Sequence, residues 1–313
     1  MNLEFKPIEA QDMEVITSFV GLRPNKSCDS VFLDSFIWKE FYHVRFAVSD
    51  GKALQWLMED KGETFSALPL CREEDLEHYF YEMVDYFNQV LHIPFKIYLA
   101  DEEGTEKLNL DPLRFRVTEQ EDLKDYLYDG DALRTLAGKK LHKKKNNVNA
   151  FMREYEGRFE YRKLCCSDRD DVWRFLDRWR EQKGEEVEEH LDYEVHGIHE
   201  ILKNCSTLPV EMGGVYIDDK MEAFTIGSLN ARENMAVIHI EKANPDIRGL
   251  YQYINREFLI HEFPDVKLVN REDDLGLEGL RKAKMSYNPV GFERKYLIEQ
   301  IDYPQQPGRM EKE

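Results

Sequence analysis

Apolar and polar residues alternate with two different periods over the first 100 residues, and together they predict a mixture of strands and helices. Residues 44–49 and 53–58 alternate as strands do, and Asp50-Gly51-Lys52 between them is typical of a tight hairpin turn. Residues 73–91 instead carry apolar side chains at the spacing of one helical face. Further elements are expected as strands at 3–8, 65–70 and 95–99 and as helices at 11–20 and 31–41.

The second half of the chain repeats this order of elements. Its hairpin turn is Asp218-Asp219-Lys220, and Asp219 follows Asp50 by 169 positions, the same offset that separates His92 from His261. A constant offset across a hairpin and a long helix favours a degenerate duplication over two unrelated α/β segments with a similar order of elements. The expected elements are strands at 159–164, 211–217, 221–229, 235–242 and 266–270 and helices at 168–180, 195–202 and 247–262.

The element order of each half is typical of the GNAT (N-acetyltransferase-like) fold, because the hairpin excludes the strict strand and helix alternation of a doubly wound nucleotide-binding sheet. We therefore expect an α/β (α+β) protein with two GNAT-like domains in tandem, each a mixed, mostly antiparallel twisted sheet flanked by helices. The expected N-terminal domain covers residues 1–128, and the expected C-terminal domain, with the active site, covers residues 158–313. A basic connecting helix is expected at residues 129–157.

Length, charge and cysteine content narrow the classes of function. A chain of 313 residues suits two domains. The formal net charge of −19 opposes contact with polyanions, so a nucleic-acid partner requires a local basic strip such as residues 139–145. Five scattered cysteines without metal-ligand spacing predict reduced, mostly buried thiols and no metal site. Without a long apolar run or a secretory signal, the chain is expected to lack a membrane span and to reside in the cytoplasm.

The turn from the strand at 235–242 into the next helix is the first candidate for donor binding, because free N–H groups at a helix start suit a phosphate. Arg248-Gly249 resembles the core of the Arg/Gln-x-x-Gly-x-Gly/Ala loop with which GNAT enzymes hold the pyrophosphate of acyl-coenzyme A, although Leu250-Tyr251 replaces the second small residue. Ordinary packing at a helix start is the alternative. The expected cofactor-binding residues are Arg248, Gly249, Leu250, Tyr251, Asn270 and Lys284.

Tyr287, His239 and Glu241 are the main candidates for acid–base chemistry, and Glu272 or Asp274 is a further acidic candidate for activating the acceptor. Tyr287, followed by Gly291-Phe292, resembles the last helix and strand of GNAT enzymes, in which a tyrosine often protonates the leaving thiolate, and it is the candidate general acid. Strand alternation places His239 and Glu241 on one sheet face, where either could act as general base. A buried, hydrogen-bonded pair is the alternative for these two residues.

Residues 138–151 and 270–289 resemble the corresponding parts of a bacterial family related to the C-terminal catalytic domain of phosphatidylglycerol lysyltransferases, and the resemblance extends over nearly the whole chain. It implies paired GNAT-like domains, as in the FemABX-type aminoacyltransferases, and transfer of an aminoacyl group from a charged tRNA. The basic segment would then contact phosphates, whereas a solvated charged face is the alternative. Its expected contact residues are Lys139, His142, Lys143, Lys145 and Asn146.

These features predict an acyl- or aminoacyl-transferase. The donor is acyl-coenzyme A if the Arg248 turn binds it and aminoacyl-tRNA if the basic segment does, and the acceptor is an amine or hydroxyl on a small molecule, a peptide or a lipid head group. No tightly bound cofactor is expected. A non-catalytic ligand-binding protein with a degenerate tandem GNAT fold is the alternative. Hydrolases are disfavoured because the sequence has neither a Gly-x-Ser-x-Gly elbow nor a His-Glu-x-x-His motif.

Overall fold

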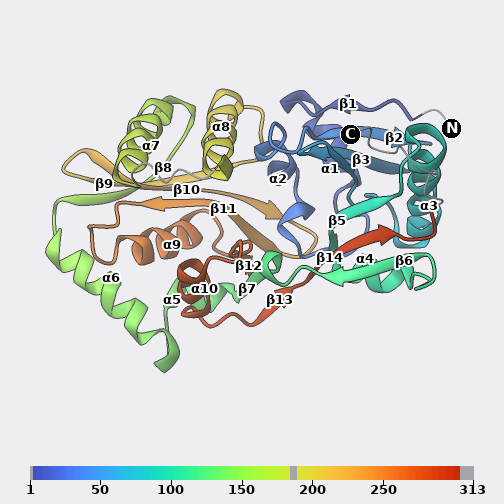
Figure 1. Cartoon of the computed structure of the whole chain (residues 1–313). Coiled ribbons are helices and arrows are strands. Elements are labelled where there is room, and N and C mark those ends of the chain that lie inside the picture. Colours follow the sequence, from blue (N-terminus) through green and yellow to red (C-terminus); the bar gives the residue numbers. More distant parts are fainter. Residues whose placement is uncertain (1–2, 184–188, 304–313) are drawn as a thin grey trace, which may run out of the picture.

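Each half of the chain builds a mostly antiparallel sheet with helices packed on its faces (Figure 1). The computed structural model describes residues 3–183 and 189–303. The first half contains β1 (Lys6–Pro7), α1 (Met13–Phe19), α2 (Phe32–Ile37), β2 (Arg45–Ser49), β3 (Ala53–Asp60), β4 (Glu63–Phe65), α3 (Leu76–Tyr86), β5 (Lys96–Asp101), α4 (Glu102–Leu108), β6 (Phe115–Glu119) and β7 (Asp125–Asp129). The remainder contains α5 (Gly130–Thr135), α6 (His142–Glu154), β8 (Phe159–Lys163), α7 (Arg169–Lys183), α8 (Glu189–Asn204), β9 (Glu211–Ile217), β10 (Lys220–Asn230), β11 (Met235–Ala243), α9 (Leu250–His261), β12 (Leu268–Asn270), α10 (Glu278–Met285), β13 (Gly291–Glu293) and β14 (Lys295–Gln300).

The strands of the two halves follow the same spatial order. The N-terminal strands run β1-β2-β3-β4, and a parallel bridge between Ser66 and Ile97 connects them to the strands β5-β14-β6. The C-terminal sheet runs β8-β9-β10-β11-β12-β7-β13, and its parallel step lies between β11 and β12. The parallel step therefore occupies the same position in both orders, which confirms the predicted repeat of elements.

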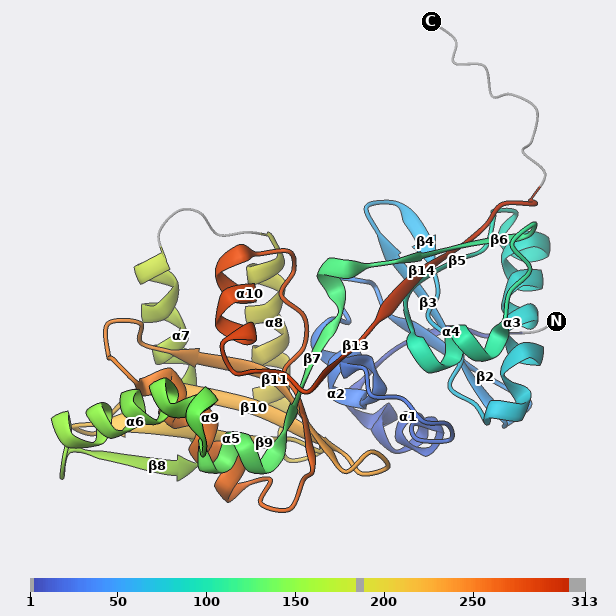
Figure 2. The same ribbon diagram turned by 90° about the horizontal axis from the view of Figure 1, so that it is seen from below.

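The two halves exchange one strand each. β7 lies at the end of the range expected for the N-terminal domain, but it pairs with β12 and β13 in the C-terminal sheet. β14 follows the last helix of the second half, and it pairs with β5 and β6 of the first. Figure 2 shows both segments crossing between the two units. Each unit is therefore completed by a strand from outside the residue range expected for its domain.

The expected connecting segment forms two helices instead of one. α5 ends because Leu136 adopts a left-handed conformation with φ of 47°, and Gly138 has φ of 84°. α6 then begins at His142, after a single 3-10 turn. Neither of these helices, nor any other within residues 3–183 and 189–303, combines the length and the hydropathy that crossing a bilayer requires.

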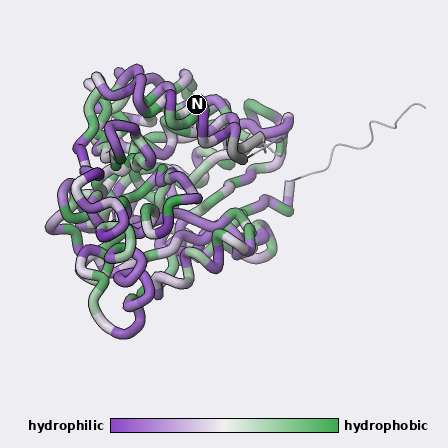
Figure 3. The backbone as a smooth tube through the Cα atoms, turned by 90° about the vertical axis from the view of Figure 1, so that its left-hand side faces the viewer, coloured by the Kyte–Doolittle hydropathy of each residue, from purple (hydrophilic) through white to green (hydrophobic). Residues whose placement is uncertain are grey.

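Buried side chains fix the two units against each other. One cluster lies between the C-terminal sheet and helices α7 and α8, and it extends into the N-terminal unit, where Phe36 and Trp56 belong to the same cluster as Phe175 and Phe224. A second cluster lies on the other face of the C-terminal sheet, beneath α5, α6 and α9, and a third surrounds α3. Figure 3 shows hydrophobic and hydrophilic positions alternating along the elements, as expected where each buries one face.

Two cysteines contradict the expectation of five reduced thiols. The Sγ atoms of Cys166 and Cys205 form a disulfide that connects the segment before α7 to the end of α8. The prediction is wrong because 39 residues separate the two cysteines, and only the packing of α7 beside α8 brings them together. Cys28 and Cys71 are buried thiols, and Cys165 is exposed.

Candidate functional site

The C-terminal sheet opens where β11 and β12 diverge. Their parallel ladder ends at the pair Val237–Asn270. The next residue, Arg271, donates its backbone N–H to the carbonyl of Tyr126 on β7 instead. Among the described residues, β11 therefore continues to Ala243 without a strand beside it on that edge. Backbone groups on such an edge are available to a ligand.

His239 is the extra residue of a β-bulge in β11. In the ladder with β10, the adjacent residues Ile226 and Gly227 pair with positions 240 and 238, which leaves His239 unpaired. A one-residue insertion reverses the side-chain alternation. Glu241 consequently lies on the face of the sheet that α9 covers, where it contacts Asn255. His239 lies on the opposite face, where it contacts Ser228. The prediction that these two side chains share one face is wrong, because the period of two does not hold across a bulge.

Glu241 is held by two partners on the α9 side. Its Oε1 accepts a hydrogen bond from Arg271 Nη2 at 2.9 Å, and its Oε2 accepts one from Asn255 Nδ2 at 2.8 Å. The side chains of Arg271 and Glu241 are 13% and 11% exposed, so little solvent screens the pair. Burial alone would lower the pKa of Arg271, but the charge of Glu241 raises it. Arg271 Nη1 is buried and lacks a hydrogen-bond partner among the described residues.

Tyr287 lies in the same cluster, on the turn after α10. The Arg271 guanidinium is 4.8 Å from the centre of its ring, and Lys144 Nζ from α6 is 4.0 Å from it. Burial raises the pKa of Tyr287 to about 12, so the hydroxyl keeps its proton. Burial and the Arg271 charge lower the pKa of Lys144 to about 8. A proton donor, an amine that titrates near neutrality and a fixed cation thus converge at the open edge of β11.

His239 belongs to a separate buried network. Its Nε2 lies 2.8 Å from Ser228 Oγ, and its Nδ1 lies 2.8 Å from Glu272 Oε1. Burial lowers the pKa of His239 to about 3, so the ring is neutral. Because both ring nitrogens have partners, neither is free to accept a proton from a substrate. Asp34, His239 and Glu272 bring ligand atoms within 4.8 Å of one another, a spacing at which they could hold a metal ion.

The Arg248-Gly249 turn packs against α6. Gly249 has φ of +86°, and a Cβ at this position would lie 2.2 Å from the carbonyl oxygen of Asn147. The glycine is therefore required by the close approach of α6. Arg248 is exposed and donates to the Asn147 side-chain oxygen at 3.3 Å. Leu250 is fully buried and Tyr251 is partly buried, so the turn presents the Arg248 side chain to solvent but little backbone.

The other two residues expected to bind the donor lie inside the protein. Asn270 is fully buried, and its Nδ2 donates to the carboxylate of Asp125 at 2.8 Å. Lys284 is 9% exposed and donates to the backbone carbonyls of Arg271 and Asp273. Both side chains are buried and hold the segment that follows β12.

The residues expected to contact phosphate lie on or beside α6. Lys144, which was not among them, lies on the same helix. Lys144 turns inward to Tyr287. Its spacing could have identified it, because it lies three residues after Leu141 and four before Val148, which are both buried. The remaining residues are all exposed, namely Lys139, His142, Lys143, Lys145 and Asn146. The segment thus divides into an outer basic face and one inward lysine.

Comparisons with known proteins identify a family. The family model described as phosphatidylglycerol lysyltransferase, C-terminal, matches residues 22–299. A conserved protein of unknown function from Bacteroides thetaiotaomicron has a crystal structure with a TM-score of 0.89 at 28% identity, over 96% of this chain and 100% of that one. An uncharacterised protein of Mycoplasmoides gallisepticum is 28% identical over 184 residues, which are 56% of this chain and 56% of that relative. The match thus spans about half the length of that curated relative.

More distant structures show the fold. L-PGS from Bacillus licheniformis has a TM-score of 0.67 at 17% identity, over 92% of each chain. FemX has a TM-score of 0.59 at 8% identity, over 93% of this chain and 96% of that one. These similarities confirm the predicted fold class of two GNAT-like units in tandem, and the family match confirms the resemblance stated from the sequence.

Proposed function

Because this chain belongs to the family of phosphatidylglycerol lysyltransferase C-terminal domains, we propose that it transfers an aminoacyl group from a charged tRNA to an amine or hydroxyl on a small molecule, a peptide or a lipid head group. The observation that carries the proposal is the convergence of Lys144, Arg271 and Tyr287 at the open edge of β11. A proton acceptor, a proton donor and a fixed positive charge are the groups that acyl transfer requires.

The two faces of α6 favour tRNA as the donor. Lys139, Lys143 and Lys145 are exposed on the segment whose inward lysine reaches the cluster. A phosphate backbone on the outer face would therefore lie along the same helix as the lysine that contacts Tyr287. Acyl-coenzyme A is the second candidate donor. The Arg248-Gly249 turn, which was expected to bind its pyrophosphate, supports it less than α6 supports tRNA. There, the Asn147 carbonyl occupies the space beside Gly249 that a phosphate-binding glycine leaves open to its ligand.

In the proposed reaction, the acceptor nitrogen or oxygen forms a bond to the ester carbonyl carbon, and the bond from that carbon to the terminal ribose oxygen breaks. Neutral Lys144 accepts the proton that the acceptor loses, and Tyr287 donates its proton to the departing ribose oxygen. Arg271 Nη1, which has no partner among the described residues, stabilises the negative charge on the carbonyl oxygen. The proton on Lys144 returns to the Tyr287 phenolate through solvent.

Glu241 has a positioning role in this scheme instead of the general-base role expected for it. Its two oxygens hold Arg271 and Asn255, so the Arg271 guanidinium is fixed before a substrate arrives. Preorganised charge of this kind costs no reorganisation during the reaction. His239 lies on the other face of the sheet with both nitrogens bonded, and we propose that it supports the bulge.

Filter binding at low salt tests the donor. A pool of tRNA charged with mixed amino acids is expected to bind more tightly than the same pool after deacylation, and acetyl-coenzyme A is not expected to compete. Thermal unfolding with acetyl-coenzyme A gives the second measurement. A rise in unfolding temperature without tRNA binding would replace tRNA by acyl-coenzyme A as the donor. Absence of both effects would reject transfer in favour of a non-catalytic ligand-binding protein.

A further inference from the structure

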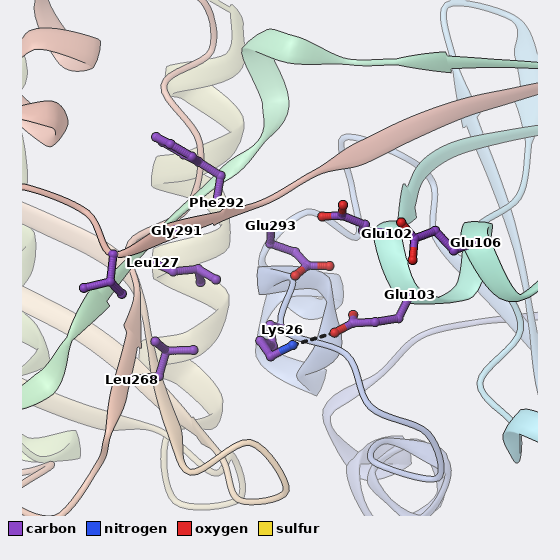
Figure 4. A pocket seen from close by; sticks show the side chains of 10 residues that line it. Lys26, Glu102, Glu103, Glu106, Leu127, Leu268, Gly291, Phe292 and Glu293 are labelled. Carbon is purple, nitrogen blue, oxygen red and sulfur yellow. Dashed lines mark hydrogen bonds and ion pairs between the residues drawn. The ribbon is translucent and has the colours of Figure 1, made fainter.

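A second candidate site is an acidic pocket of about 450 Å³ between the two units (Figure 4). Residues of α4, β7, β12 and β13 line it, together with Lys26 from the segment before α2. Leu127 lines this pocket, while its neighbour Tyr128 packs against Tyr287. Adjacent residues of a strand point to opposite faces. The pocket is therefore separate from the cluster around Tyr287, and ligand binding in it does not depend on aminoacyl transfer.

Carboxylates outnumber cations around this pocket. Lys26 Nζ lies 2.5 Å from Glu103 Oε1, and Arg294, which is not among the lining residues, lies 2.6 Å from Glu102. Within residues 3–183 and 189–303, neither Glu106 nor Glu293 forms a salt bridge. The lining carboxylates are those of Glu102, Glu103, Glu106 and Glu293. Two carboxyl groups of the lining, those of Glu106 and Glu293, can thus still be matched by a ligand.

Two carboxylate oxygens of the pocket are buried without a hydrogen-bond partner in the described chain, Glu103 Oε2 and Glu293 Oε1. Glu293 is 3% exposed, and Figure 4 shows its side chain extending from β13 toward Lys26 and Glu103. Native proteins satisfy nearly all buried polar atoms, so each exception requires an explanation. A bound hydrogen-bond donor is the explanation that accounts for both oxygens in one place.

The lining of the pocket favours an organic cation over a metal ion as its ligand. The apolar part of the lining comes from Leu127, Leu268, Val290 and Phe292, which suits a ligand with a hydrocarbon part. A metal ion requires several ligand atoms close together. In the described chain, three such atoms within 4.8 Å of one another occur around Asp34 and not among these glutamates. The net charge of −19 also attracts organic cations.

We propose that this pocket binds an aliphatic primary amine in its ammonium form, with the nitrogen at Glu103 Oε2 and Glu293 Oε1 and the hydrocarbon chain against Leu127 and Leu268. An ammonium group has three N–H donors, which is enough for both free oxygens. Hydrogen bonds between ionised partners are stronger than those between neutral ones.

The affinity of the pocket for the amine is expected to depend on pH. Burial raises the pKa of Glu293 to about 8, and the charges of Glu103, Asp101 and Asp125 add to this effect while Lys26 opposes it. Near neutral pH the Glu293 carboxyl therefore keeps its proton, and an arriving ammonium must displace it. Affinity should rise as the pH increases toward about 8 and level off above it, because the ionised form is the one that binds.

Isothermal titration calorimetry of the full chain with n-pentylamine tests the proposal, with 1-pentanol and MgCl2 as comparison probes. Pentylamine is expected to bind, and the other two are not. At a pH above about 8, where the Glu293 carboxylate is ionised, Glu293→Gln should weaken pentylamine binding by at least about tenfold, because it replaces an ionised acceptor by a neutral one. Glu77→Gln, which removes an exposed charge on α3, is the matched control and should leave the affinity unchanged.

Three outcomes would overturn the proposal. They are a wild-type protein that does not bind pentylamine, equal binding of pentanol and pentylamine, and a folded Glu293→Gln protein with unchanged affinity. Circular dichroism establishes whether the variant folds, and Glu103→Gln is the second variant if it does not. The pH series distinguishes a direct contact from a structural effect, because Glu293→Gln should abolish the rise in affinity toward pH 8 as well as lower the affinity.

Discussion

Arg271 Nη2 donates a hydrogen bond to Glu241 Oε1 over 2.9 Å, and this buried contact crosses the gap between β11 and the segment that follows β12. It joins two stretches of chain that share no strand pairing beyond Val237. The same guanidinium keeps Nη1 free of partners in the described chain. One side chain therefore both closes the sheet and offers a donor to a ligand.

Arg271→Met is expected to destabilise the protein by about 3–5 kcal/mol, because it leaves the Glu241 carboxylate buried and unpaired. Urea unfolding measures the effect. Arg248→Met is the matched control, since Arg248 is exposed, and it should change the free energy of unfolding by no more than about 0.5 kcal/mol. Adding Glu241→Leu to Arg271→Met should recover part of the loss. A loss below about 1 kcal/mol for the single variant would contradict the pairing.

Tyr287→Phe keeps the ring that Lys144 and Arg271 contact but removes the hydroxyl. If Tyr287 protonates the leaving ribose oxygen, the single-turnover rate of aminoacyl transfer should fall by about 10²–10⁴-fold. The free energy of unfolding should change by only about 1–1.5 kcal/mol. Tyr81→Phe, in the N-terminal unit, is the control. An unchanged rate would assign Tyr287 to packing alone.

Lys144→Met should remove the proton acceptor and lower the transfer rate, whereas Lys143→Met on the outer face of α6 should leave the chemical step unchanged. The pKa of Lys144 is lowered to about 8, and the neutral amine is the active form. The wild-type rate should therefore rise with pH through about 8 and then level off, and this inflection should be absent in Lys144→Met. A rate that falls through the same interval would show that the charged form acts instead.

Replacing Lys139, Lys143 and Lys145 together by alanine should weaken tRNA binding and flatten its dependence on salt. Each phosphate contact contributes about 0.7–0.9 to the slope of log affinity against log salt concentration, so the slope should decrease by about 2–3. Filter binding at salt concentrations from about 50 to about 200 mM measures this slope. The control removes three exposed lysines elsewhere, Lys52, Lys61 and Lys220. Equal effects of the two triple variants would point to net charge and not to a contact surface.

Local patterns predict the elements well where neighbouring residues decide the structure. The strand expected at 211–217 matches β9, and both hairpin turns form as expected, with positive φ at Asp50 and Asp219. The strand expected at 65–70 is shorter, because β4 ends at Phe65 and the following residues make isolated bridges. The exchanged strands β7 and β14 are set by partners far away in the sequence, which periodicity does not report.

The candidate site could be predicted only in part, because it too depends on contacts between residues far apart in the sequence. Glu241 and Tyr287 do converge, and Arg271 lies between them. Arg271 was missed because its role comes from the divergence of β11 and β12, which no local pattern encodes. His239 was placed on the wrong face because a single bulged residue leaves the hydrophobic alternation on either side intact. Lys144 was not distinguished from the other lysines of the basic segment, although its spacing from Val148 places it on the inward side of α6.

β14 is the middle strand of β5-β14-β6, yet more than half of the chain is synthesised between β6 and β14. Until β14 emerges, β5 and β6 have no common neighbour, so the unit translated first is finished last. Separating the halves at their expected boundary would leave an incomplete sheet on each side. Despite their internal repeat, the two units are indivisible, and they must reach the native state together.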